Sequence, residues 1–492
     1  AGDIPKTSLY LEKAAERAYN NYQLKPALAY YNRLLKLTAE ANNPKQTCNY
    51  YLKKGRVLEQ TGDWELCIEI YEKALELARK IDDIHLLATA NNSMGRLLML
   101  KGAYFEANVY MQAAAGLHEF QDDQPGIAGV YGNLGNLYFR QGKYDQAQSF
   151  FEKSISIAKN AGQHSLDAQI VANLGLTHMN RGNYIEGVTC ILEQLIIYEQ
   201  IKEKQALAIL YTNLAIIYFE KGEYDLALES YRKGLQLSEE LGNPLLKSIA
   251  IGGIGSVYEK KGDYTKAMEH FQQDLQLSEE LGDKQGIAIS LGLIGELLSI
   301  IGDFHKAIEY LQKNLMLCES LNYQKGIAKA LNTLGDVFFA LKSYDRSIHF
   351  YDRAIEVTRR IGNKLVLGFS LAEKGTVLAA TGDTHTLVPV CREALEIAQT
   401  LDNPELQFEA KLLNARKDHL LGNTKEAEIK ILDLIQSKLS PDKEAHAYFE
   451  LFLISQKDEL YRKAARKRYE ELFANTPRYL FKERLDLLNS PA

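Results

Sequence analysis

A spacing of forty residues runs through the sequence and constrains its fold more than any other feature. Glycine, or alanine in two places, occupies one column of positions at this spacing: Gly55, Gly95, Gly135, Gly175, Ala215, Gly255, Gly295, Gly335, Gly375 and Ala415. A second column lies seven residues later: Gly62, Gly102, Gly142, Gly182, Gly222, Gly262, Gly302, Lys342, Gly382 and Gly422. Self-similarity at a fixed period of this length is typical of repeat architectures. The sequence therefore predicts an array of similar, stacked repeats.

Each repeat is expected to form two helices. Around the first glycine column, Tyr131, Leu134, Gly135 and Tyr138 follow the i, i+3, i+4, i+7 spacing of one helix face. The second glycine column fits the residue that ends a helix with a positive φ angle. We count twelve repeats and a last helical stretch, which predicts an all-α solenoid of about twelve helix-turn-helix repeats with a C-terminal capping helix. The expected divisions are an atypical capping repeat at 1–47, the repeat array at 48–444, and an atypical repeat with the capping helix at 445–492.

The first glycine column is expected to have a packing role. Glycine inside a helix is less favourable than alanine by about 0.8–1 kcal/mol, so eight such residues cost about 8 kcal/mol, which is comparable with the net stability of a whole domain. We interpret these glycines as positions where the second helix of the same repeat approaches closely: Gly55, Gly95, Gly135, Gly175, Gly255, Gly295, Gly335 and Gly375. One repeat departs from the pattern, because Pro389 lies in its second helix. This proline is expected to start that helix late or to kink it.

The conserved order within a repeat is L-G-x-x-Y, then G-x-Y, A and an aromatic residue, as in Tyr218, Gly222, Tyr224, Ala227 and Tyr231. This order resembles the tetratricopeptide repeat, whose usual period is about 34 residues. The forty-residue form is similar to the repeats of LGN-type G-protein-signalling adaptors and kinesin light chain. The resemblance implies a superhelix whose first helices line a concave groove, and a role in binding proteins. It does not identify the partner, because this fold serves many partners.

The composition of the sequence further limits the classes of function that we expect. The net charge of −6 argues against nucleic acid as a partner, and no apolar run approaches the ~20 residues that span a bilayer. The five scattered cysteines suit free thiols in a reducing compartment, so a cytoplasmic protein is expected. Because no zinc-ligand spacing, phosphate loop or catalytic motif is present, we predict no metal, no cofactor and no enzymatic activity.

Helical geometry also predicts which side chains face the groove. In a first helix, the positions of Gly129, Asn133, Asn136 and Arg140 lie opposite the packed face. By the resemblance, these positions line the groove. The predicted groove residues are basic in the early repeats, amides in the middle and apolar later: Lys53, Arg56, Arg96, Asn133, Asn136, Arg140, Asn173, Asn213, Ile249, Gly253, Ile289 and Leu293. The last repeats are acidic on this face, with Glu296, Asp336 and Glu373.

The uneven groove suggests how a partner would lie in it. We expect an acidic end of the partner near Arg56, Arg96 and Arg140, and an apolar anchor near Gly253, which is expected to face away from its helix pair. Asparagine side chains offer both a donor and an acceptor, so they suit the backbone of an extended peptide, and the resemblance implies the same use here. An apolar patch on a wet face marks a binding site, although the chain itself could cover it instead.

Three functions stay open. The first is an adaptor or scaffold that binds a peptide or a helical segment in the groove. The second is a regulatory or sensor arm of a larger signalling protein, in which the groove senses an intramolecular segment. The third, a helical-repeat reader of nucleic acid, is disfavoured by the net charge. The partner's identity and the oligomeric state are not predicted.

Overall fold

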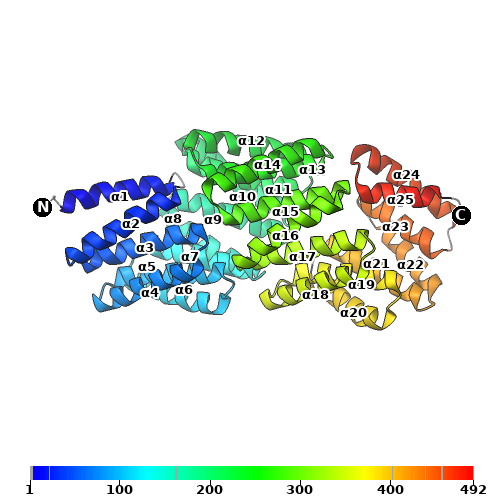
Figure 1. Ribbon diagram of the computed structural model, residues 1–492, viewed down its shortest axis with the longest axis horizontal. Helices are drawn as coiled ribbons and strands as arrows, with labels where there is room; N and C mark the ends of the chain where they lie inside the picture. Colours follow the sequence, from blue (N-terminus) through cyan, green and yellow to red (C-terminus); the bar gives the residue numbers. More distant parts are fainter. Residues whose placement is uncertain are drawn as a thin grey trace. The chain divides into compact units, whose positions relative to one another are not determined.

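The computed structural model describes residues 4–20, 23–160, 164–401, 403–437, 439–455 and 458–490. Within these residues every regular element is an α-helix, and the helices follow one another along the chain (Figure 1). Their bounds are α1 (Ile4–Asn20), α2 (Leu24–Glu40), α3 (Pro44–Thr61), α4 (Trp64–Lys80), α5 (Ile84–Leu100), α6 (Tyr104–Phe120), α7 (Gln124–Arg140), α8 (Tyr144–Asn160), α9 (His164–Asn180), α10 (Tyr184–Ile201), α11 (Lys204–Glu220), α12 (Tyr224–Leu241), α13 (Pro244–Lys260), α14 (Tyr264–Leu281), α15 (Lys284–Ile301), α16 (Phe304–Ser320), α17 (Gln324–Ala340), α18 (Tyr344–Ile361), α19 (Lys364–Thr381), α20 (Thr384–Thr400), α21 (Pro404–Leu420), α22 (Thr424–Gln436), α23 (Pro441–Ile454), α24 (Glu459–Asn475) and α25 (Tyr479–Asn489).

The described helices form twelve consecutive pairs, α1–α2 to α23–α24, followed by α25. This confirms the predicted all-α solenoid of helix-turn-helix repeats with a C-terminal helix. The chain divides into two compact units, which are described separately. The first contains the described residues up to Val257 with His270–Ile287 and Leu321–Tyr323, and the second contains Tyr258–Glu269, Ala288–Ser320 and the described residues from Gln324 onward. The expected divisions after residues 47 and 444 stay predictions.

The turn inside each pair confirms the role of the second glycine column. In the turn between α7 and α8, Gly142 has a φ of 71°. Its N–H donates to the carbonyl of Phe139 (3.0 Å), and the N–H of Lys143 donates to the carbonyl of Tyr138 (2.9 Å). These bonds occupy carbonyls that the end of the helix leaves without partners. All nine glycines of the column have a positive φ: Gly62, Gly102, Gly142, Gly182, Gly222, Gly262, Gly302, Gly382 and Gly422.

Lys342 is the residue of this column that is not glycine, and its φ is 57°. A side chain costs about 1 kcal/mol in this left-handed conformation, whereas glycine makes the unfolded chain more flexible. We therefore expect Lys342→Gly to be neutral or to stabilise the protein by up to about 1 kcal/mol, measured by chemical denaturation. The matched control is Gly382→Lys, which lies in open space at a φ of 75° and should destabilise by about 1 kcal/mol. A clear loss of stability in Lys342→Gly would contradict this account of the turn.

The first glycine column has the expected packing role in seven helix pairs. A Cβ atom at Gly135 would lie 2.5 Å from Cδ1 of Phe151, well inside contact distance. A Cβ at Gly175 would lie 2.9 Å from Cδ1 of Ile191 and 3.3 Å from the backbone oxygen of Gly187. In each of these pairs the residue sixteen positions after the glycine fills the space: Tyr71, Met111, Phe151, Ile191, Phe271, Leu311 and Tyr351. The partner helix therefore packs a large side chain onto each glycine.

The eighth glycine is packed from a different helix, so the prediction of a same-repeat partner is wrong for Gly375. Sixteen positions later the chain has the small Cys391, and Leu413 of α21 takes the space instead, with its Cδ1 2.9 Å from a Cβ at Gly375. The expected late start of the next helix is also wrong. α20 begins at Thr384, in register with the other pairs, and contains Pro389.

Gly253 is a second correction. The first column has Ala215 in this part of the chain, where most other repeats have glycine. The ring of Tyr231, sixteen residues later, lies against Gly253 of α13 instead, where a Cβ would be 2.8 Å from Tyr231 Cε2. Tyr231 is only 5% exposed. Gly253 therefore faces the packed interior and not the open groove.

Among the described helices, only α15 is long and apolar enough to cross a membrane by length and composition. It is the first helix of a pair, and its Gly295 packs against Leu311 of α16 in the same way as in other pairs. This packing accounts for α15 as a helix of the repeat array.

Candidate ligand-binding site

Several of the predicted basic groove residues already contact other side chains of the chain. Lys53 of α3 forms ion pairs with Glu12 (2.5 Å) and Glu16 (2.6 Å) of α1. Arg96 of α5 pairs with Glu59 of α3 (3.0 Å). Arg56 lies over the ring of Tyr19, with its guanidinium carbon 5.6 Å from the centroid. These contacts connect the first helices of neighbouring pairs, and they pair the charges of Lys53 and Arg96 with carboxylates of the chain.

The predicted asparagines also bind one another. The Nδ2 of Asn133 donates to Oδ1 of Asn92 (2.9 Å), and the Nδ2 of Asn173 donates to Oδ1 of Asn136 (2.9 Å). Asn213 donates to the carbonyl of Ile209 in its own helix (2.8 Å). Each amide keeps further donor and acceptor capacity. The side-chain amides of these asparagines thus use part of their hydrogen-bonding capacity within the chain. Their binding to a peptide backbone stays a prediction.

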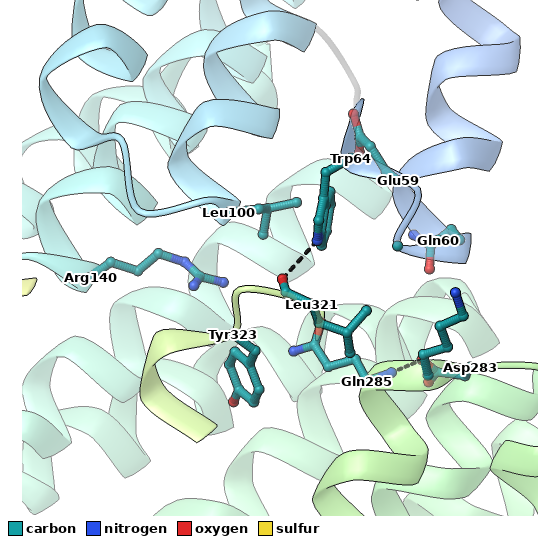
Figure 2. A pocket seen from close by; sticks show the side chains of 11 residues that line it. Glu59, Gln60, Trp64, Leu100, Arg140, Asp283, Gln285, Leu321 and Tyr323 are labelled. Carbon is teal, nitrogen blue, oxygen red and sulfur yellow. Dashed lines mark hydrogen bonds between the residues drawn. The ribbon is translucent and has the colours of Figure 1, made fainter. Parts of the chain in front are cut away.

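Arg140 lines a small cavity of the first compact unit together with Trp64, Leu100, Leu321 and Tyr323 (Figure 2). The indole Nε1 of Trp64 donates to the carbonyl of Leu321 (2.7 Å) across this cavity. Its volume is about 60 Å³, which is room for a few water molecules. A cavity of this size cannot take a peptide segment.

The predicted apolar residues divide between the two compact units. Ile249 and Gly253 belong to the first, and Ile289 and Leu293 belong to the second. The side chains of Ile249 and Ile289 are 43% and 44% exposed, whereas Leu293 is partly buried. Each unit therefore keeps an exposed isoleucine at the predicted position, and Gly253 supplies no pocket.

The second compact unit contains a much larger cavity, with a volume of about 770 Å³. Its wall includes α17, α19, α21, α23 and α25. Several lining residues occupy the repeat positions of Asn133, Asn136 and Arg140: Ile300, Asp336, Ala340, Glu373, Thr376, Ala380, Arg416 and Leu420. The cavity thus lies on the helix face that the sequence assigned to the groove.

Much of this cavity was not found from the sequence. Asp336 and Glu373 were noted as acidic groove residues, but Glu409, Arg416 and Glu450 were not. The repeat position of Asn136 does extend to Arg416 and could have indicated it. The residues of α25 that line the cavity had no such signal, because α25 lies outside the forty-residue pattern.

Arg416 is the centre of a closed network on one side of the cavity. It binds Glu450 through Nε (2.9 Å) and Nη2 (2.6 Å), and its Nη1 donates to the hydroxyl of Thr376 (2.8 Å). Burial alone would raise the pKa of Glu450, but the Arg416 guanidinium outweighs it and holds that pKa below its usual value. Burial and the nearby Arg484 lower the pKa of His446 to about 3, so this imidazole is neutral. The guanidinium group of Arg416 is therefore already paired with the carboxylate of Glu450.

Six other carboxyl groups line the cavity without an ion pair within the described residues, and three of them have a raised pKa. We call Asp336, Glu373 and Glu409 the carboxylate cluster. Asp336 accepts a hydrogen bond from the hydroxyl of Tyr351. Burial raises the pKa of Asp336 to about 6, and burial with repulsion from Asp336 raises that of Glu373 to about 8. Burial also raises the pKa of Glu409. At neutral pH the cluster retains protons that a nearby cation would displace.

Apart from Lys342, the remaining lysine and arginine residues of the cavity wall contact aromatic residues. Lys443 lies 5.8 Å from the ring centroid of Phe408, and the guanidinium carbon of Arg478 lies 5.4 Å from that of Phe481. Arg484 donates to the hydroxyl of Tyr469. Phe304 packs edge-on against Tyr479, with ring centroids 4.8 Å apart. The cavity thus combines unpaired carboxyl groups with aromatic surface.

Comparison with known families agrees with this architecture. The family described as MalT-like TPR region matches residues 209–452, and two families described as Tetratricopeptide repeat match residues 85–160 with 167–240 and residues 49–81. The chain belongs to the tetratricopeptide-repeat proteins.

Solved structures similar to this tetratricopeptide-repeat protein have low sequence identity to it. A Rap protein complexed with competence and sporulation factor has 14% identity and a TM-score of 0.50, with 73% of this chain and 99% of that chain covered. Aspartyl phosphate phosphatase F from Bacillus subtilis has 16% identity and a TM-score of 0.48, with 73% and 95% covered. The apo quorum sensor NprR from B. thuringiensis has 16% identity and a TM-score of 0.46, with 72% and 99% covered. No curated protein matches the sequence.

Proposed function

We propose that this protein is a scaffold or adaptor that binds a peptide or helical segment of another protein, and that the segment places an arginine or lysine side chain in the cavity of the second compact unit. The carboxylate cluster carries this proposal. Its three carboxyl groups lie in a cavity of about 770 Å³ and have no ion pair within the described residues. Glu373 and Glu409 are half-buried and Asp336 is exposed to the cavity. A carboxylate in such a place is stabilised by a paired cation, and a basic ligand would supply one.

The size and the lining of the cavity fit such a side chain. Pockets of about 300–1,000 Å³ commonly hold a compact ligand group. Aromatic residues such as Phe339 and Tyr344 line the same cavity as Asp336. A guanidinium or ammonium group binds to carboxylates and also to aromatic faces. Because Lys53 and Arg96 are already paired, we propose that the charged group of the ligand binds at the carboxylate cluster and not at the early basic residues.

A second candidate function is favoured by α25. This helix lines the same cavity, and its Arg484 adds to the larger effect of Arg416 in lowering the pKa values of Glu373 and Glu409 against the effect of burial. Arg484 forms no ion pair with them and binds the Tyr469 hydroxyl instead. In this second candidate the protein is a regulatory arm. The helix α25 is then the intramolecular segment in the cavity, and a partner has to share the cavity with it. The similar Rap protein, solved with a bound factor, supports a fold that takes ligands.

The test uses displayed random 12-residue peptides, selected on the full chain and then synthesised with each basic residue replaced by citrulline, which keeps the shape without the charge. We expect the charged peptides to bind at least about tenfold more tightly than their citrulline forms, since a lost charged pair costs about 1.5–3 kcal/mol. Glu373→Gln should weaken them similarly. Glu356→Gln, an exposed residue of α18 outside the cavity, is the matched control and should not. Equal binding of charged and citrulline peptides would contradict the proposal.

The same binding should depend on pH. Glu373 and Asp336 have pKa values raised to about 8 and about 6, so a cation has to displace their protons near neutral pH. The affinity for a charged peptide is therefore expected to rise between pH 6 and about pH 8 and then level off. Fluorescence anisotropy across this range measures it. In Glu373→Gln the upper part of the rise should disappear, and an unchanged profile would contradict the assignment.

A further inference from the structure

Two histidines and an aspartate from three consecutive helical segments meet at the start of α7. His85 belongs to α5, His118 belongs to α6, and Asp123 directly precedes α7. The Oδ2 atom of Asp123 lies 2.8 Å from Nδ1 of His118 and 3.1 Å from Nδ1 of His85. The three candidate ligand atoms all lie within 4.8 Å of one another. Imidazole nitrogen and carboxylate oxygen are common ligands of zinc.

Two of these side chains are held in place by the local fold. Asp123 caps α7, because its Oδ1 accepts the N–H of Gly126 (3.1 Å), and this leaves Oδ2 directed at the histidines. His118 is only 3% exposed. Its ring occupies the space that Gly126 leaves free, where a Cβ would lie 2.5 Å from Cε1. A metal ion would therefore find two ligands already oriented, as good sites require.

The third side chain leaves the cluster open to solvent. The side chain of His85 is 60% exposed, so water can complete the coordination of an ion bound beside it. Around zinc at ~2.0–2.1 Å from each ligand, tetrahedral ligand atoms are ~3.3 Å apart. The observed 2.8 Å and 3.1 Å are a few tenths of an ångström shorter. A small rotation of the exposed His85 ring lengthens the 3.1 Å distance, whereas the 2.8 Å distance requires the His118 and Asp123 side chains to separate by about 0.5 Å.

The neighbouring repeats show which residues occupy the equivalent positions and which contact they form. At the repeat positions of His85 and Asp123, the preceding repeat has Lys45 and Asp83, which form an ordinary ion pair (2.8 Å). The repeat position of His118 is Ala78 before it and Ala158 after it. Compared with the preceding repeat, the lysine is replaced by a histidine and a third ligand group is added beside it. A simple ion pair between helices needs neither change.

We propose that His85, His118 and Asp123 bind one Zn²⁺ ion through the two Nδ1 atoms and a carboxylate oxygen, with water as a further ligand. The ion would connect α5 and α6 with the start of α7 and so hold two consecutive repeats together. Three protein ligands and one water complete the four-coordinate shell that zinc prefers.

The experiment measures zinc binding to the full chain after treatment with a chelator. We expect isothermal titration with ZnCl₂ at pH 7.5 to show one equivalent bound, and Co²⁺ to give the visible absorption of a four-coordinate ion. The key variant is His85→Lys, because it should keep an ion pair with Asp123 like that of Lys45 with Asp83. It is expected to fold normally and to bind Zn²⁺ at least about 100-fold more weakly.

A control histidine separates this site from general binding to surface histidines. His305→Ala removes an exposed histidine of α16 and should bind one equivalent of Zn²⁺ as tightly as the unchanged chain. Zn²⁺ should also raise the melting temperature of the unchanged chain and of His305→Ala, but not that of His85→Lys. The proposal is overturned if no single saturable equivalent is found, or if His85→Lys binds Zn²⁺ as the unchanged chain does.

Discussion

Gly175→Leu should lower the stability of the protein by about 1–3 kcal/mol, the usual cost of overpacking. The reason is the close approach of α9 and α10. A Cβ at Gly175 would already lie 2.9 Å from the side chain of Ile191 and 3.3 Å from the backbone oxygen of Gly187. The Ile191 side chain can change its rotamer, but the backbone of α10 has to move away as a whole. Urea denaturation measures the loss, and faster proteolysis near this pair should accompany it.

The matched control makes the same substitution where there is space. Gly116 lies within α6, is exposed, and has no atom within 4 Å of a Cβ position. Because leucine favours a helix more than glycine, Gly116→Leu should stabilise the protein by up to about 1 kcal/mol. The two substitutions therefore have opposite signs. If Gly175→Leu is as stable as the unchanged chain, or if both lower stability equally, the close-packing account of the glycines is wrong.

Glu373→Gln should raise the stability of the protein at pH 8 by at least about 1 kcal/mol, since one pKa unit corresponds to about 1.4 kcal/mol. In the folded chain the pKa of Glu373 is raised to about 8 by burial and by Asp336, from an ordinary value of 4.5. Between these values the folded state keeps a proton that the unfolded state releases. The unchanged chain therefore loses stability as the pH rises from about 4.5 to about 8. Glutamine removes this loss.

The pH dependence of the difference distinguishes this effect from a general change in packing. Near pH 4.5 the glutamate is protonated in the folded state, and the two proteins should differ little. The gap should widen toward pH 8, as measured by thermal unfolding across the range. Glu356→Gln, at an exposed position of α18, should run parallel to the unchanged chain. Parallel curves for Glu373→Gln as well would show that Glu373 is not a buried, unpaired carboxyl group.

The fold was predictable because the residues that determine it lie close together in the sequence and recur at a fixed spacing. The glycine that ends each first helix, and the residue sixteen positions after the first glycine column, are both readable at a fixed spacing. The exceptions arose where one substitution redirected another side chain. Ala215 gives no sign in its own repeat that Tyr231 lies against Gly253, and Cys391 gives none that Leu413 packs on Gly375. These exceptions depend on whether a large side chain packs on the glycine of its own helix pair or on a glycine of a neighbouring pair.

The binding residues were less predictable, because they depend on partners from several helices. Helix geometry indicated a groove face, and the large cavity lies on that face. It could not indicate that Lys53 and Arg96 are already paired, while Glu373 and Glu409 are not. His85, His118 and Asp123 have none of the spacings of known zinc motifs, since each comes from a different segment. Their proximity depends on how one helix pair stacks on the next.

Tyr231 and Leu413 also determine where the chain can be cut. The stability of a repeat array is approximately the sum of a term for each repeat and a term for each junction between repeats. Where the large side chain packs on a neighbouring pair, its contribution belongs to the junction. A fragment ending after α12 would expose the ring of Tyr231, and one ending after α20 would leave Gly375 uncovered. Boundaries such as that between α10 and α11 leave Ile191 packed on Gly175 within its own pair, and they are the better places to divide the protein.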